Sequence, residues 1–144
     1  MITDVFAAAP DAVPAYRQAS FPDPQEYGFM TLRARGLDPV ALAILDVLLS
    51  ETDLEEAVSH AAQTPGQEPD LYTTPVITAL SSRTVTLLPA VGTEKLTHLA
   101  EDWSQFPELA DASPEAIRDW LSQLQILCRN AVDNEELLSV WNCL

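Results

Sequence analysis

Residues 40–50 read VALAILDVLLS, and this stretch decides the fold class because it is apolar on every helical face apart from Asp46. A helix of this kind is buried on most sides, so we expect it to be the central element of the core. The residues before it form a good helix entry: Asp38 can cap the free amides, and Pro39 suits the first helical position. The sequence therefore predicts a buried helix that begins at Pro39.

Two amphipathic helices are predicted in the C-terminal part of the chain. Thr93 is expected to cap the first, whose apolar stripe runs from Leu96 to Trp103 at helical spacing and ends before Pro107. The second follows the clearest helix start in the sequence. This helix is predicted to begin at Ser113-Pro114-Glu115, and its apolar stripe runs from Ile117 to about Val132. Asn134 is expected to be its left-handed C-terminal cap.

A further helix is predicted directly after the core helix. Thr52 and Glu55 have the spacing of a capping box, and the pattern continues to about Ala62. Residues 63–75 then combine prolines with polar residues, which is typical of an exposed loop. This segment is the expected site for a proteolytic nick or an insertion.

Four segments carry the pattern of strands: residues 26–35, 76–80, 84–88 and 137–143. Gly28 is expected to weaken the first strand or to mark a bulge in it. The two middle strands are interpreted as a hairpin, and the last as a docked strand, because a solvated tail would rarely be so apolar. The predicted fold is α+β and mainly helical, with four or five helices on a small antiparallel sheet.

The whole chain, residues 1–144, is expected to form a single domain. Its length permits burial of roughly two thirds of the unfolded surface, and 47% of the residues are hydrophobic. Residues 1–24 are predicted to be an irregular N-terminal segment, because Pro10 and Pro14 would interrupt any long helix there.

The charge of the chain restricts the classes of partner. There are 22 acids and seven bases, which gives a formal net charge of −15. Such a field repels nucleic acids and anionic membrane surfaces, and attracts basic proteins. The simpler interpretation is that the negative charge only keeps the protein in solution.

The sequence also indicates the cellular compartment of the protein. The N-terminus has no basic region followed by an apolar stretch, and no segment approaches the roughly 20 apolar residues of a membrane span. Cys128 and Cys143 are isolated from one another and from histidines, which is typical of small buried thiols in a reducing environment. We therefore expect a cytoplasmic protein.

Catalytic and cofactor motifs are absent from the sequence, so no catalytic residue, metal or cofactor is predicted. The serines lie in no nucleophile elbow, and the four glycines form no phosphate-binding loop. Glu94, His98 and Asp102 recur every four residues and so line one helix face, which would suit a metal or a general base. Charge pairs at this spacing are also ordinary on a solvated helix face.

The predicted function is a non-enzymatic, bacterial-type interaction domain that binds another, basic protein. Inhibitors and immunity proteins that neutralise basic toxins or nucleases are a concrete instance. The candidate binding surface is an acidic patch, which also suits a helix dipole: Glu51, Asp53, Glu55 and Glu56. The alternatives are a small-ligand binder or metal-dependent enzyme that uses the Glu94/His98/Asp102 face, and a subunit that associates with itself.

Overall fold

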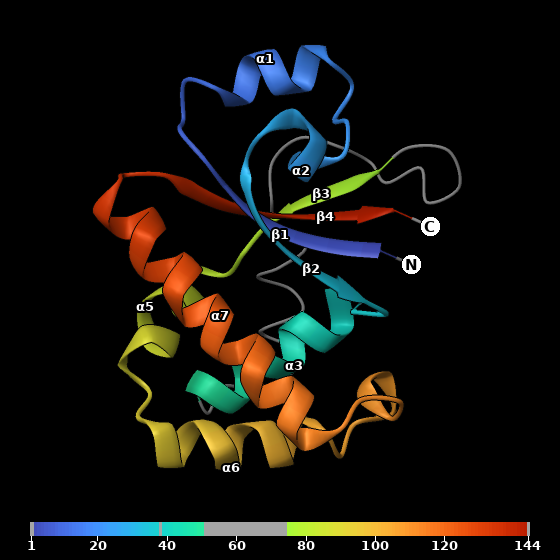
Figure 1. Ribbon diagram of the computed structural model, residues 1–144, viewed down its shortest axis with the longest axis vertical. Helices are drawn as coiled ribbons and strands as arrows, with labels where there is room; N and C mark the ends of the chain where they lie inside the picture. Colours follow the sequence, from blue (N-terminus) through green and yellow to red (C-terminus); the bar gives the residue numbers. More distant parts are fainter. Residues whose placement is uncertain (1, 38, 51–74, 144) are drawn as a thin grey trace.

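A four-stranded antiparallel sheet lies between two groups of helices (Figure 1). The computed structural model describes residues 2–37, 39–50 and 75–143. Within these residues the order of strands across the sheet is β2-β1-β4-β3. The strands are β1 (Ile2–Ala8), β2 (Met30–Arg35), β3 (Val76–Ala79) and β4 (Leu137–Cys143).

Six α-helices occur in the described part of the chain, which confirms an α+β, mainly helical fold. Two short helices, α1 (Val13–Gln18) and α2 (Pro24–Tyr27), lie on one side of the sheet (Figure 1). On the other side lie α3 (Pro39–Ser50), α5 (Ser82–Leu87), α6 (Thr93–Trp103) and α7 (Pro114–Asp133), with the 3₁₀ helices η1 (Leu88–Ala90) and η2 (Pro107–Leu109). Helix α7 packs on β1, β2 and β4, and α6 lies farther from the sheet, against α7 and α3.

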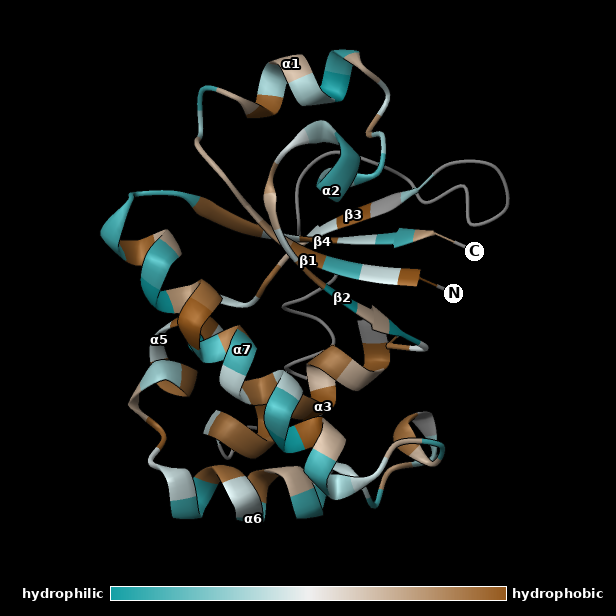
Figure 2. Cartoon of the chain, viewed as in Figure 1, coloured by the Kyte–Doolittle hydropathy of each residue, from teal (hydrophilic) through white to brown (hydrophobic). Residues whose placement is uncertain are grey.

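The main core lies between the sheet and the second group of helices. The predicted core helix is confirmed as α3, in which Leu45 is completely buried. Trp103 from α6 is also buried, and its indole N–H donates a 3.0 Å hydrogen bond to the carbonyl oxygen of Ala41 in α3. Apolar and polar residues alternate along α6 and α7, as the stripes predict (Figure 2). None of the described helices is both long enough and apolar enough to cross a bilayer.

A second, aromatic core lies on the opposite face of the sheet, under α1 and α2. Tyr16 of α1 contacts the ring of Phe6 from β1 edge to face, with 5.5 Å between ring centroids. The ring of Phe29 stacks on Phe6 at 5.4 Å. Trp141 of β4 belongs to the same buried cluster. The sheet is therefore buried on both faces at its centre.

Strand β1 corrects the prediction of an irregular segment over residues 1–24. It pairs along its whole length with β4, from Ile2 opposite Cys143 to Ala8 opposite Leu137. Residues 3–8 are all buried, since helices cover both faces of the sheet at this strand. A strand buried on both faces lacks the alternation of polar and apolar residues that sequence patterns detect.

The predicted strand 84–88 is wrong, because these residues belong to α5 and η1. The hydroxyl oxygen of Ser81 accepts a hydrogen bond from the backbone N–H of Arg83 and so caps α5. Strand β3 pairs with β4, which replaces the predicted hairpin. The predicted strands 76–80 and 137–143 are confirmed.

Several predicted helix ends differ in detail. In the segment 26–35 the strand begins only at Met30, and Gly28 ends α2 with a φ of 101°. Thr93 is the first residue of α6 rather than its cap, which is Gly92. Asn134 is not left-handed, and Glu135 adopts the positive φ, 54°, instead. Ser113 caps α7 as predicted.

Other predictions fall on residues that the structure does not describe. These are the cap at Asp38, the helix from Thr52 to Ala62, and all of the loop 63–75 except Pro75.

Candidate functional site

Negative charge is unevenly distributed along the chain. Residues 93–136 carry ten acids and three bases, a formal charge of −7. Residues 51–74 carry six acids and no base, whereas the rest of the chain has six acids and four bases. The sheet and the helices α1, α2, α3 and α5 are therefore almost neutral, and α6, α7 and their connections carry much of the excess.

The exposed acids of this region lie on α6, on α7 and in the segments that follow these helices. The buried residues of α6, such as Leu96 and Trp103, face the core, so its polar residues are left on the outside. Within the described side chains, Arg118 lies 3.6 Å from Asp119, and His98 lies 3.6 Å from Glu101. We call this surface the acidic helical face; its exposed acids are Glu94, Glu101, Asp102, Asp111, Glu115, Asp119, Asp133 and Glu135.

The structure places Glu94, His98 and Asp102 together on α6, within the acidic helical face. The imidazole of His98 is 69% exposed, and its Nδ1 approaches Glu101, a residue of the next turn, rather than either predicted partner. No group of three His, Cys, Asp or Glu side chains suited to a metal occurs among the described residues. The geometry thus resembles a solvated helix face.

Glu51, Asp53, Glu55 and Glu56 lie outside the described residues. These four acids contribute to the net charge of the chain but are not counted in the acidic helical face.

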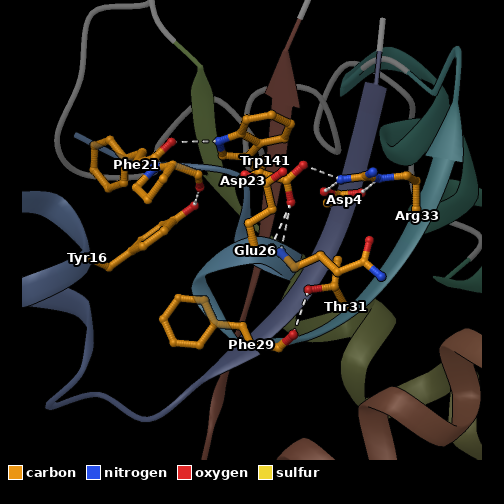
Figure 3. A network of polar contacts seen from close by, with 11 residues as sticks. Asp4, Tyr16, Phe21, Asp23, Glu26, Phe29, Thr31, Arg33 and Trp141 are labelled. Carbon is orange, nitrogen blue, oxygen red and sulfur yellow. Dashed lines mark hydrogen bonds and ion pairs between the residues drawn. The ribbon is translucent and has the colours of Figure 1, made fainter. Parts of the chain in front are cut away.

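An ion pair with a buried carboxylate links β1, β2 and α2 on the aromatic side of the sheet (Figure 3). Asp4 is fully buried, and its two carboxylate oxygens accept 2.8 Å hydrogen bonds from Nε and Nη2 of Arg33. The same Nη2 donates to Asp23, whose other oxygen caps α2 through the amides of Gln25 and Glu26. Burial raises the pKa of Asp23, but the hydrogen bonds from Arg33 and the two amides outweigh it, so this pKa lies below its usual value.

The strained turn before α2 is fixed by two hydrogen bonds (Figure 3). Ser20 and Phe21 have φ values of 65° and 51°, a region that side chains disfavour. The indole N–H of Trp141 donates to the carbonyl oxygen of Phe21 at 3.0 Å, and the hydroxyl of Tyr16 donates to that of Pro22 at 2.6 Å. Burial raises the pKa of Tyr16, so its hydroxyl stays protonated and serves as a donor.

A buried carboxylate joins α3 to α5. Oδ1 of Asp46 accepts hydrogen bonds from the hydroxyls of Ser81 at 2.7 Å and Thr84 at 3.3 Å, while Oδ2 has no partner among the described residues. Both donors are neutral hydroxyls on one short helix. We interpret Asp46 as an anchor for α5.

Asp46 stands out in the sequence as the one acid of an otherwise apolar helix, but its partners Ser81 and Thr84 do not. For Asp4 the only available signal was its pairing with an arginine, Arg33, which stands opposite it in the register of β1 and β2. That signal requires knowledge that residues 2–8 form a strand. Comparison of the chain with known protein families, curated proteins and solved structures gave no match.

Proposed function

We propose that this chain is a protein-interaction domain that binds a basic partner protein through the acidic helical face. The observation that carries the proposal is the concentration of exposed acids on α6, α7 and the segments that follow them, in a chain whose sheet is almost neutral. Opposite charges on two surfaces accelerate their encounter and fix their orientation. An inhibitor or immunity-type protein that covers the basic surface of a toxin or nuclease would use this chemistry.

The packing beneath the face supports the same role. The interior side of α6 is held against α7, and the rings of Trp103 and Trp120 approach to 6.1 Å between centroids. A surface that is already ordered loses little conformational entropy on binding, so more of the contact energy contributes to affinity. Exposed carboxylates are acceptors only, and thus suit the Lys and Arg side chains of a partner.

The proposal is tested by the rate of association with the partner. The immobilised full chain would first capture proteins from the native lysate, and the captured protein would be identified and purified. We expect its association rate to fall steeply between low and physiological salt, with a smaller change in the dissociation rate. An association rate that does not depend on salt would contradict the proposal.

Matched variants locate the binding surface. The double substitution Glu101→Gln with Asp102→Asn removes two charges from the acidic helical face. The control, Asp11→Asn with Glu26→Gln, removes two exposed charges on the α1–α2 side of the sheet. We expect only the first variant to slow association several-fold. If only substitution of the patch from Glu51 to Glu56 by amides has this effect, binding lies there and not on α6.

A further inference from the structure

A cavity of about 540 Å³ lies between the start of α6 and one face of α7. Its volume falls in the range of small-molecule sites. The α7 wall carries Arg118, Ser122 and Arg129, which are four and seven residues apart and so share one helix face. Gly92 and Thr93, at the first turn of α6, form the opposite wall.

The cationic lining of this cavity is unexpected in such an acidic region. The chain has only seven bases, and two of them, Arg118 and Arg129, line this cavity although the surrounding segment has a formal charge of −7. We propose that the cavity binds a small organic anion through a carboxylate or phosphate group. A guanidinium matches either group with two parallel N–H donors.

Hydrogen bonds hold Arg129 and the segment before α6 in place. Nη2 of Arg129 donates a 2.7 Å hydrogen bond to the carbonyl oxygen of Pro89, which positions the guanidinium. Buried Gln125 donates from Nε2 to the carbonyl oxygens of Leu88 and Val91, each at 2.9 Å, and so fixes the segment before α6 to α7. One guanidinium and the backbone opposite it are thus positioned before a ligand arrives.

The first turn of α6 adds further donors. Its N-cap is Gly92, so no side-chain oxygen accepts from the amides of this turn. Such amides, together with the helix dipole, favour a negative group. They reinforce the two guanidinium groups rather than forming a site on their own.

The surroundings restrict the ligand to a small one. Asp119 lines the same cavity, and Arg118, which lies 3.6 Å from it, is 44% exposed. A nucleic acid or another polyanion would extend over the acids of α6 and α7 and would be repelled. A molecule with one or two anionic groups can contact the arginines without reaching those acids.

The proposal is tested by a ¹H–¹⁵N NMR titration of the full chain at constant ionic strength. The probes are inorganic phosphate, glycerol 3-phosphate, acetate and citrate, with glycerol as the uncharged control. We expect saturable shifts of the Gly92 and Thr93 amides, with a Kd of about 1 mM or tighter for at least one anion. The comparison of the phosphates with the carboxylates identifies the anionic group that is preferred.

Charge-matched variants distinguish this site from general anion attraction. Arg118→Gln and Arg129→Gln should each weaken binding about tenfold or more, because each removes charge-assisted hydrogen bonds. Arg17→Gln, which removes an exposed arginine from α1, should leave the Kd unchanged. Equal weakening in all three variants, binding that survives in both cavity variants, or no saturable shift with any probe would each overturn the proposal.

Discussion

Arg33 neutralises Asp4 across the first two strands, with both carboxylate oxygens of the buried acid at 2.8 Å from guanidinium nitrogens. Replacing Arg33 by Gln leaves a buried charge without its partner, so we expect a loss of about 3 kcal/mol in the free energy of unfolding. Urea denaturation measures it. Arg35→Gln, at an exposed arginine of the same strand that does not contact Asp4, should change stability by less than about 0.5 kcal/mol. Similar losses in the two variants would show that the ion pair is unimportant.

The same network predicts a dependence of stability on pH. The folded-state pKa of Asp23 lies below its ordinary value of 3.8, so its contribution to stability is complete above that value. This contribution is lost as pH falls through the lowered folded-state pKa. Thermal unfolding between pH 6 and pH 2 should therefore show a shallower loss for Asp23→Asn than for the natural chain. If the unfolding temperature falls equally with pH in both chains, Asp23 does not make this contribution to stability.

The main core can be tested at α3. Leu45 is completely buried, so Leu45→Ala should lower the free energy of unfolding by about 2–5 kcal/mol. Leu48 is only partly buried, and Leu48→Ala should cost less. Equilibrium denaturation of both variants provides the comparison. A loss below about 0.5 kcal/mol for Leu45→Ala would place α3 outside the core.

The position of β4 predicts the effect of a truncation. Deletion of residues 137–144 removes a strand that pairs with both β1 and β3, together with the buried Trp141. The truncated chain should lose its cooperative thermal transition, which calorimetry and near-ultraviolet circular dichroism would detect. A transition as sharp as that of the full chain would show that the sheet does not depend on this strand.

The buried thiol of α7 predicts a difference in reactivity. Cys128 has no exposed surface, and burial raises its pKa from 9.0 to about 11. Burial disfavours the thiolate, so the stability of the fold does not depend on this group below pH 9 and falls as pH rises from 9 towards 11. At pH 8 we expect no alkylation of Cys128 by iodoacetamide in the folded chain and full alkylation in urea, measured by peptide mass spectrometry. Rapid modification without urea would contradict the burial.

The elements that could be predicted from the sequence are those whose signals are local. Helix α7 has a Ser-Pro start and a long apolar stripe, and α3 has an apolar sequence of helical length. Both signals depend only on neighbouring residues. The exposed position of Glu94, His98 and Asp102 on α6 also follows from the place of the apolar stripe.

The elements that were missed depend largely on distant residues. The β-branched segment of α5 has a local cap at Ser81, but its helix is anchored by the bonds from Ser81 and Thr84 to Asp46, more than 30 residues earlier. Strand β1 contains Asp4, whose burial is tolerable only beside Arg33. The arginines of the proposed anion site share a face only once α7 is assigned, and the opposite wall comes from α6.

The pairing of β1 with β4 has a consequence for the order of folding. Ile2 lies opposite Cys143, so the central pairing of the sheet closes a loop of nearly the whole described chain. Contacts of such large sequence separation form slowly, since the entropy of loop closure is lost before they contribute energy. β1 is synthesised well before β4, so this pairing cannot form until β4 has been made. During that interval the apolar residues of β1, among them Val5 and Phe6, are open to chaperones and to other nascent chains.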